Sequence, residues 1–567
     1  MKRSIGKILS RFVSPAFLLL FLLTGCTNSK VTVWVASPWQ RVLRSTPPDT
    51  VKTADLKAAA NEYEPFRIII HNDGTHRVSK VTVTVSDLKG SQGVIKADDM
   101  QLYRAHYINI TQPSAGTDNP IGWYPDALIP FLPKKAGTNE YSETYMKWLS
   151  GTNENSANKI LYIASPFVVD PSENAEVWCD LYVPPGTKPG NYSGTASVVS
   201  GKQKLADIPV NLKVWGFQLP DTIAMRSNFG RFSQADGEMM GIQYGSKDYT
   251  YMESLYDKEL LSNRAIPATP SFVWPAWDKD KGITDNGQSA LMKELVEKEH
   301  FNALDIPYLY ISDPVKSRNY LSDMADWLNK LGFLNMSYVQ MENEPNSAEA
   351  YENVRREAAV IKSANPKISR LCTVSTLPEN SSWGNLYGSV DIWAPLWNNW
   401  DEKTAGERLS RGEKLWSHTE LSNGPAKTPK WEIDMDPLNF RAPLWISWHY
   451  SITGMLYWSS VYWDDYGSLN GVWESPHYQN SFWGDGVLLY PGHVAGSEHF
   501  VPSIRIKLYR EAEEDYEYMN MAAKMGMKKD VDRIVDNIAN SFQDWSHNIT
   551  AYEKAREELA NLILSKK

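Results

Sequence analysis

The segment at residues 338–345 carries the clearest chemical signal in the sequence. An apolar run at 338–341 is followed directly by Glu342, Asn343 and Glu344, and then by a proline. One carboxyl group here is a candidate for the acid that protonates a glycosidic oxygen. In enzymes that cleave glycosidic bonds, an Asp or Glu side chain carries out this step. Alternation along a strand predicts Glu342 and Glu344 on one side and Asn343 on the other. The alternative is an acidic strand end that favours the N-terminus of the next helix.

The composition is consistent with a sugar ligand. The 567 residues include 22 Trp and 29 Tyr, and the formal net charge of −9 is unsuited to binding nucleic-acid phosphates. Aromatic faces beside acids and amides suit a neutral, hydroxyl-rich ligand, although a large core also needs aromatic residues for packing. We expect Glu342 to contact substrate, together with aromatic residues at predicted strand ends: Trp274, Tyr310, Trp397, Trp416, Trp458 and Trp463.

Strand–helix alternation begins after residue 215 and indicates a parallel sheet. Apolar runs predict eight strands, at residues 225–229, 266–272, 307–311, 338–341, 370–374, 392–397, 415–419 and 455–459. Eight strands in about 240 residues are typical of a (β/α)8 barrel, whose active site lies at the carboxyl ends of the strands. Glu342, Asn343 and Glu344 follow the fourth of these strands.

Other segments predict the domains around this barrel. Residues 26–215 show period-two runs separated by Gly, Pro, Asn and Asp, which predict an N-terminal β-sandwich. A long insertion rich in Pro and aromatic residues interrupts it at about 107–158, and insertions of that length are usually functional. The barrel is expected to span 216–502, and 503–567 to form a helical segment packed on the barrel.

Four stretches, in this order along the chain, resemble proteins related to glycoside hydrolase family 123. They are ANEYEPF at 60–66, WYPDALIP at 123–130, GDGVLLYPG at 484–492, and SIRIKLYR at 503–510 with EDYEY at 514–518. The resemblance covers most of the mature chain and implies a β-sandwich followed by a (β/α)8 catalytic barrel. Asp126, in the second stretch, becomes a candidate substrate contact.

The same resemblance implies a mechanism. Characterised family members are exo-acting β-N-acetylgalactosaminidases that retain configuration. In them the 2-acetamido group of the substrate attacks the anomeric carbon, steered by an Asp, and the adjacent Glu is the acid/base. The matching pair here is Asn343-Glu344, so the acid/base is kept and an amide replaces the carboxylate. An amide cannot offset the positive charge of an oxazolinium ion.

A second resemblance points to another carboxylate. Asn-Glu after a fourth strand resembles a large superfamily of barrel glycosidases with a Glu nucleophile after the seventh strand. Here the seventh predicted strand is followed by Glu420. We therefore predict a retaining glycoside hydrolase with Glu344 as acid/base and Glu420 as candidate nucleophile. The alternatives are an acetamido-assisted β-N-acetylgalactosaminidase that uses Asn343 and Glu344, and a non-catalytic carbohydrate-binding lipoprotein on a degenerate barrel.

The N-terminus predicts the location. Residues 1–25 combine four cations with a short apolar run and precede Cys26. This order predicts a secretory signal, and its Leu-x-Gly-Cys end resembles a bacterial lipobox, which implies a lipid anchor on Cys26 at the cell envelope. An ordinary signal with an accidental cysteine is the alternative. The other cysteines, Cys179 and Cys372, lie in different predicted domains and are not expected to pair, and we expect no metal or cofactor.

Overall fold

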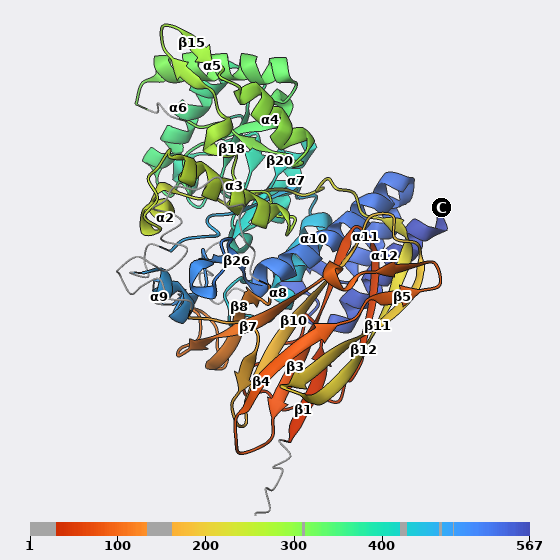
Figure 1. Ribbon diagram of the computed structural model, residues 1–567. Helices are drawn as coiled ribbons and strands as arrows, with labels where there is room; N and C mark the ends of the chain where they lie inside the picture. The colour runs from red at the N-terminus through yellow and green to blue at the C-terminus, as the bar shows by residue number, and fades with distance from the viewer. Residues whose placement is uncertain are drawn as a thin grey trace, which may run out of the picture.

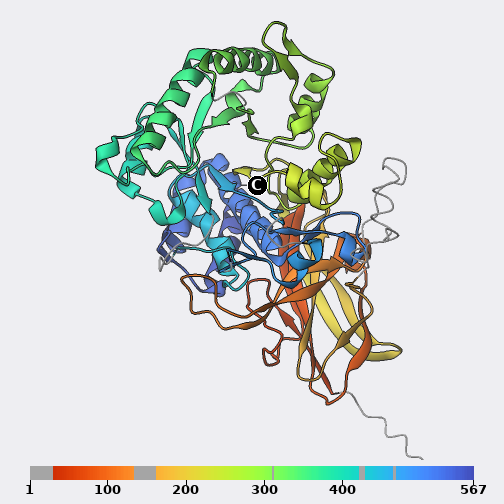
Figure 2. The ribbon, with the colours of Figure 1, turned by 90° about the vertical axis from the view of Figure 1, so that its left-hand side faces the viewer.

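The computed structural model describes residues 30–132, 161–308, 312–419, 428–463, 468–479 and 481–566. Cys26, Tyr310 and Glu420 lie outside these ranges, as do residues 1–25 and part of the predicted insertion. The described residues form a β-rich part, a strand–helix part and a C-terminal group of helices, seen from two sides in Figure 1 and Figure 2. In these ranges no helix is long and apolar enough to cross a membrane.

Two sheets of mostly antiparallel strands build the N-terminal part, as the period-two pattern predicts. One sheet has the order β1-β3-β10-β7-β8, and the other has the order β2-β12-β11-β4-β9, with a β5–β6 hairpin beside β11. The strands are β1 (Val31–Ala36), β2 (Ala54–Ala60), β3 (Glu62–Asn72), β4 (Val78–Val85), β5 (Leu88–Gly90), β6 (Gly93–Ile95), β7 (Met100–Ile110), β8 (Gly122–Pro130), β9 (Phe167–Val169), β10 (Asn174–Val183), β11 (Gly190–Ser200) and β12 (Gln203–Gln218).

Alternation decides which side chains fill the sandwich. In β3, Phe66, Ile68 and Ile70 belong to the apolar core of the two sheets. Arg67, between them, lies on the opposite face, is 3% exposed and donates to the carbonyl of Ser37. The second face of this sheet is therefore covered as well.

The strand–helix part contains two parallel sheets. Their orders are β16-β17-β18-β19-β20 and β13-β22-β21. The strands are β13 (Arg226–Asn228), β16 (Leu304–Asp305), β17 (Ser337–Gln340), β18 (Ser369–Cys372), β19 (Ile392–Trp393), β20 (Lys414–Leu415), β21 (Ser417–Thr419) and β22 (Gly454–Tyr457). The parallel sheet is confirmed, but these paired strands do not form the single closed barrel that the sequence predicts.

The predicted second strand, residues 266–272, is not a strand. Pro267 and Pro270 have no N–H group to donate, so this segment cannot complete a sheet ladder. Its remaining backbone groups still bond to the chain after β13, since Phe229 donates to the carbonyl of Ile266 at 3.0 Å and Ala268 donates to Gly230 at 2.8 Å. The segment therefore lies against one sheet without extending it.

Helices alternate with the parallel strands and continue to the C-terminal end. They are α2 (Gln234–Met239), α3 (Lys247–Leu261), α4 (Gln288–Glu297), α5 (Pro314–Leu331), α6 (Ala348–Ala364), α7 (Glu402–Ser410), α8 (Leu438–His449), α9 (Leu469–Glu474), α10 (Ile504–Ala522), α11 (Lys528–Asp536) and α12 (Ile549–Ser565). The hydroxyl of Ser347 accepts the N–H of Ala350 and caps α6. Ser347 lies three residues after Glu344, and α6 begins at the next residue, Ala348.

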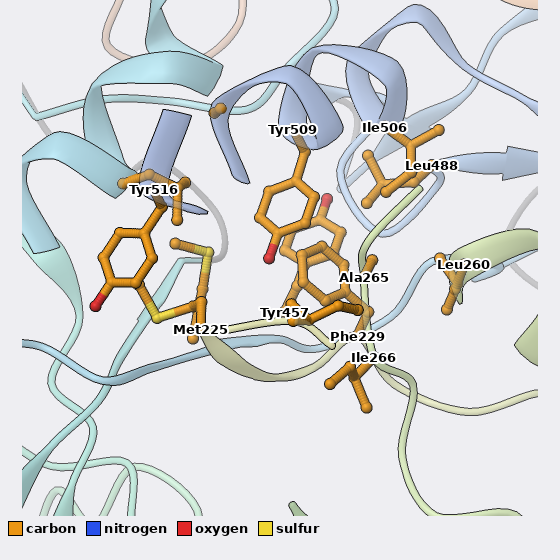
Figure 3. Packing of buried hydrophobic residues seen from close by; sticks show 14 of the residues in the cluster. Met225, Phe229, Leu260, Ala265, Ile266, Tyr457, Leu488, Ile506, Tyr509 and Tyr516 are labelled. Atoms are coloured by element: carbon orange, nitrogen blue, oxygen red, sulfur yellow. The ribbon is translucent and has the colours of Figure 1, made fainter. Parts of the chain in front are cut away.

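Helix α10 joins the β-rich and strand–helix parts. Figure 3 shows Tyr509 and Tyr516 of α10 beside Met225, Phe229 and Tyr457 of the strand–helix part, and the rings of Phe229 and Tyr509 are 4.6 Å apart. The same helix forms buried ion pairs with both parts, Arg510–Asp180 at 2.6 Å and Asp515–Arg441 at 2.6 Å. The charged residues of this helix are thus structural. Both described cysteines, Cys179 and Cys372, are buried and free, as predicted.

Candidate active site

Inward-facing side chains of the parallel strands pack into one small apolar cluster. Its members lie in the parallel strands from β16 to β22 or directly beside them: Ala303, Tyr338, Leu371, Ile392, Ala394, Trp416 and Leu456. The rings of Tyr338 and Trp416 are 5.2 Å apart, and Trp416 is 1% exposed. This apolar layer includes residues of both parallel sheets.

A polar layer follows one pleat further along the same strands. Residues i and i+2 of a strand share a side. Two residues beyond five members of the apolar layer lie Asp305, Gln340, Thr373, His418 and Trp458. Active sites of parallel α/β proteins form at the carboxyl ends of the strands. The polar layer is therefore the candidate active site.

Glu344 and His418 form the main contact of this layer. Glu344 Oε1 lies 2.7 Å from His418 Nε2, and the two side chains are 33% and 8% exposed. His418 Nδ1 lies 2.6 Å from the carbonyl oxygen of Ala394. Because a carbonyl oxygen can only accept, Nδ1 must carry a proton and Nε2 is left to exchange a proton with Glu344. The imidazole is held from one side and its other nitrogen orients the carboxyl group.

The backbone turns sharply at Glu344. Its φ of 44° lies in the left-handed region, which is unusual for a residue other than glycine. The Glu344 N–H donates to the hydroxyl of Thr373 at 2.9 Å, and this hydroxyl also lies 2.9 Å from Asn343 Oδ1. Strained backbone of this kind is often found at functional sites. Thr373 thus supports both residues of the Asn-Glu pair.

The turn separates Glu344 from Glu342, which corrects the expectation that the two share a side. Glu342 accepts a bond of 3.3 Å from Asn353 of α6, and its N–H donates to Glu357 of the same helix at 2.9 Å. Strand geometry ends at Gln340, before these residues, so alternation no longer applies. Glu342 therefore faces α6 rather than the polar layer.

A pocket of about 370 Å³ is lined in part by residues of the polar layer. Asp305, Gln340 and Trp458 line it together with Arg231 and Tyr462. Arg231 and Asp305 form an ion pair of 2.6 Å, with side-chain exposures of 49% and 12%. The pocket thus combines an aromatic wall with charged hydrogen-bonding groups, the usual composition of a polar-ligand site.

Trp458 is the predicted aromatic residue that lines this pocket. Its Nε1 donates to Asp485 at 3.3 Å, and its ring lies 4.8 Å from that of Tyr462 and 5.2 Å from that of Tyr478. A Cβ at Gly486 would lie 2.5 Å from the Trp458 ring, so glycine lets the chain pack directly against it. The ring is therefore held in place by several neighbours.

Three of the other described aromatic candidates serve packing, which corrects their predicted role. Trp397, Trp416 and Trp463 are each at most 3% exposed. Trp274 is partly buried, with its ring 6.3 Å from that of Trp327 of α5, and its contact with substrate stays a prediction. Trp rings at strand ends point inward or outward according to register, and exposure cannot be deduced from the residue type. Tyr310 lies outside the described residues.

Asp126 is also structural rather than a substrate contact. It is 1% exposed, pairs with Arg505 of α10 at 2.8 Å and accepts the Tyr490 hydroxyl at 2.6 Å. All three residues belong to stretches that carry the family resemblance. In this structure those stretches hold β8 and α10 together.

Sequence reasoning did not identify Arg231, Asp305 or Thr373. Asp305 ends β16, two residues before the strand predicted at 307–311, so the boundary error hid its position. Thr373 follows β18 and was predicted as part of a strand, where a threonine gives no functional signal. Within the described ranges no cluster of His, Cys, Asp and Glu is arranged to hold a metal ion.

A carboxyl group held by a histidine and a polar pocket, both at the carboxyl ends of parallel strands, are the features expected of a hydrolase that acts on polar substrates. Residues 316–522 match the family described as "Glycoside hydrolase 123, catalytic domain". The protein is a glycoside hydrolase, and this segment is similar to the catalytic domain of family 123. The matched residues include Asn343, Glu344, Thr373 and His418.

A solved structure with a TM-score above 0.5 shows the same fold. A family 123 glycoside hydrolase from Clostridium perfringens, described in connection with glycolipid glycan hydrolysis, has a TM-score of 0.65 and 13% identity, covering 94% of this chain and 98% of that one. A family 39 glycoside hydrolase from Bacteroides cellulosilyticus WH2 has a TM-score of 0.32 and 12% identity, covering 81% of each chain. No curated protein sequence matches this chain.

Proposed function

We propose that the protein cleaves glycosidic bonds of a glycan with Glu344 as the acid that protonates the leaving oxygen. The observation that carries this proposal is the 2.7 Å contact between Glu344 and His418 in the polar layer. Glu344 is one-third exposed, so a substrate can reach it, while His418 is nearly buried and holds it in position. A carboxyl group aimed by a buried partner is suited to proton transfer.

The hydrogen-bond partners of Glu344 and His418 indicate which atoms carry protons when Glu344 acts as an acid. Oε1 of Glu344 faces the imidazole, so Oε2 is the oxygen available to a substrate. Oε2 can hold a proton while Oε1 accepts from Nε2 only if His418 is protonated on both nitrogens. After the proton moves to the leaving oxygen, the imidazolium stabilises the new carboxylate. In a retaining mechanism the same carboxylate then takes a proton from the attacking water.

Glu420 remains our proposal for the second carboxylate. It directly follows β21, the strand that carries His418, and lies outside the described residues. A carboxylate nucleophile at this point in the chain supports a retaining reaction through a glycosyl-enzyme intermediate. Without it, retention would have to use a group of the substrate.

We also propose that the two parallel sheets form one (β/α)8 barrel interrupted at its second strand. Strands β16 to β20 and β21, β22 and β13 follow in barrel order, with β20 and β21 separated by one residue. The proline-containing segment bonds to the chain after β13, and Thr269 and Asp305 bond to each other's backbone N–H groups at 2.5 and 3.0 Å. The shared apolar layer supports this arrangement, because barrel interiors are filled in such layers.

The pocket is the proposed position of a sugar ring. Trp458 offers an aromatic face for the C–H groups of a sugar, and Asp305 and Arg231 offer an acceptor and donors for its hydroxyls. Gln340 borders the pocket and ends the strand that leads to Glu344.

The lipid anchor is a separate proposal. The sequence before Cys26 has the order of a lipoprotein signal, and β1 begins at Val31, five residues after Cys26. A lipid on Cys26 would hold the sandwich close to the surface of a bacterial membrane, in the cell envelope. The catalytic part would then act on glycans outside the cytoplasm.

Turnover measurements test the proposed function. The full chain should release product from members of a panel of aryl glycosides and oligosaccharides that includes glycolipid glycans, and Glu344→Gln should not do so at a comparable rate. Binding of a sugar by calorimetry, with no product from any panel member, would instead indicate a carbohydrate-binding protein. Equal turnover by Glu344→Gln and the natural sequence would remove Glu344 from the reaction.

A further inference from the structure

A second pocket, here called the sandwich pocket, lies at the edge of the two N-terminal sheets. Its volume is about 170 Å³, and it shares no lining residue with the pocket that Arg231 and Asp305 line. Residues of β7, β8 and β9 line it, together with the start of β10 and with Arg44 from the chain between β1 and β2. A space of this size holds several water molecules, or a carboxylate with the atoms that carry it. The charged side chains on its walls therefore decide what it binds.

Arg104 of β7 brings an unpaired cation to the sandwich pocket. Its Nε is buried and has no hydrogen-bond partner, and among the described residues no carboxylate pairs with its guanidinium. The guanidinium carbon lies 6.0 Å from the centre of the Phe167 ring of β9. Removing an unpaired charge from water is costly, so cations in such positions normally have a partner. Arg104 thus has N–H donors available for an anion that enters the pocket.

Arg44 brings a second guanidinium to the same pocket. Its Nε pairs with Glu173 at 2.9 Å, and its guanidinium carbon lies 4.9 Å from the centre of the Trp123 ring. Burial and the charge of Arg44 lower the pKa of Arg104, because the two cations repel each other. A bound anion would offset this repulsion and accept charge-assisted hydrogen bonds from the arginines.

The two acids on the pocket wall already have arginine partners. Glu173 pairs with Arg44, and Asp170 pairs with Arg77, which is not part of the wall. These two ion pairs leave the charge of Arg104 uncompensated. The sandwich pocket therefore carries a positive charge that favours anions over neutral groups.

Trp123 gives the pocket an aromatic wall. Its side chain is 42% exposed, and its backbone carbonyl accepts the N–H of Arg44 at 3.1 Å, which keeps the two residues together. An aromatic face beside hydrogen-bond donors suits a sugar ring. We propose that the sandwich pocket is an accessory binding site for an acidic sugar, with the carboxylate or sulfate at Arg104 and Arg44 and the ring beside Trp123. This site is separate from the reaction and does not depend on the role of Glu344.

Calorimetry with matched monosaccharides tests the proposal. The full chain is titrated with methyl galacturonide, methyl galactoside 6-sulfate and neutral methyl galactoside, all of one anomer. We expect at least one anionic ligand to bind about tenfold or more tightly than the neutral one, as charge-assisted hydrogen bonds to arginine provide. The tighter of the two anionic ligands identifies the anion. Equal affinities for all three, or no binding of either anionic ligand, would overturn the proposal.

Two variants and one control place the ligand in the sandwich pocket. Arg104→Gln removes the unpaired charge and should weaken the anionic ligand by about tenfold or more, and the neutral ligand much less. Trp123→Ala should weaken the anionic sugars but not inorganic phosphate, which has no ring to contact the indole. Arg318→Gln, at an exposed position on α5, is the matched control and should bind as the natural chain does.

The same titrations can contradict the site. Unchanged affinity in a folded Arg104→Gln variant would mean that the anion binds elsewhere and would overturn the proposal. Inorganic phosphate that binds as tightly as the acidic sugars, with no effect of Trp123→Ala, would indicate a simple anion site and would overturn it as well. Thermal unfolding checks each variant. If Arg104→Gln does not fold, Trp123→Ala decides together with added salt, which should weaken the acidic sugar in the natural chain; no effect of either would overturn the proposal.

Discussion

The carboxyl group of Glu344 and the imidazole of His418, 74 residues apart in the chain, meet at 2.7 Å between Oε1 and Nε2. The contact spans from the turn after β17 to β21, so it depends on the order of the strands between them. His418 is anchored by the carbonyl of Ala394, which leaves its other nitrogen free to serve Glu344. The side chain of β21 that contacts Glu344 is thus an imidazole, which can donate a hydrogen bond to the carboxylate from Nε2.

Glu344→Gln tests proton donation. The amide keeps the shape of the side chain and removes the proton that the leaving oxygen needs. General acid catalysis contributes typically ~10²–10⁴-fold, so kcat/KM for substrates with poor leaving groups should fall by about that factor. Aryl glycosides with good leaving groups should be affected much less in the first step. The measurement is a series of kcat/KM values against leaving-group acidity, and an equal loss for every leaving group would argue against an acid role.

His418→Gln tests the hydrogen bond that His418 donates to Glu344. Glutamine can still donate an N–H to Glu344, whereas phenylalanine fills the space of the ring without a donor. We therefore expect His418→Gln to retain more of the natural kcat/KM than His418→Phe, which serves as the matched control. Equal activity of the two variants would show that the hydrogen bond from His418 to Glu344 does not contribute to the reaction.

Glu420→Gln tests the proposed nucleophile. We expect it to abolish turnover, because no glycosyl-enzyme intermediate can form without the carboxylate. Incubation of the natural chain with a 2-fluoro glycoside should label Glu420, which peptide mass spectrometry would locate. Glu407, which pairs only loosely with Arg408 at 4.0 Å on α7, provides a control as Glu407→Gln and should leave activity unchanged. Full activity of Glu420→Gln would show that another group takes this role.

The buried acids of α10 predict a pH dependence of stability. Burial, and secondarily the charge of Glu62, raises the pKa of Glu514 to about 7. Burial also raises the pKa of Glu62 and Glu517. A group whose folded pKa exceeds its unfolded value stabilises the fold at low pH, and this contribution is lost as pH rises through the folded pKa. Apparent Tm should therefore fall between pH 5 and pH 8.

Glu514→Gln isolates one contributor to that fall. At about 1.4 kcal/mol per pKa unit, Glu514 contributes on the order of a few kcal/mol between these limits. The variant should show a smaller loss of Tm between pH 5 and pH 8 than the natural chain. Glu558→Gln, at an exposed position near Arg533, is the control and should follow the natural chain. A Tm that rises across this range would contradict the assignment.

Cys26→Ala tests the lipid anchor. The natural chain, expressed in a bacterium with a labelled fatty acid, should incorporate the label and sediment with membranes. The variant has no thiol to modify, so it should carry no label and accumulate as precursor or appear in the soluble envelope fraction. Natural chain found in the cytoplasm with residues 1–25 still attached would contradict the proposed location.

The sequence by itself was sufficient for features that depend on neighbouring residues. The period-two runs predict the strands of the sandwich, and the apolar run before Glu342 predicts β17. Glu344 could be identified because it follows that strand and precedes Pro345 and a helix cap at Ser347. Each of these signals lies within a few residues, where backbone preferences and alternation act directly.

Only the tertiary structure decided which of these residues meet. Strand pairing aligns Tyr338 with Ser369, and this register brings Thr373 to the turn that holds Asn343 and Glu344. The left-handed backbone at Glu344 turns its side chain from α6 to His418. Such contacts are set by pairing between distant strands, and no local pattern encodes that pairing. The tryptophans show the same limit, because packing around each ring, not its residue type, determines that Trp458 borders the pocket while Trp416 is buried beneath it.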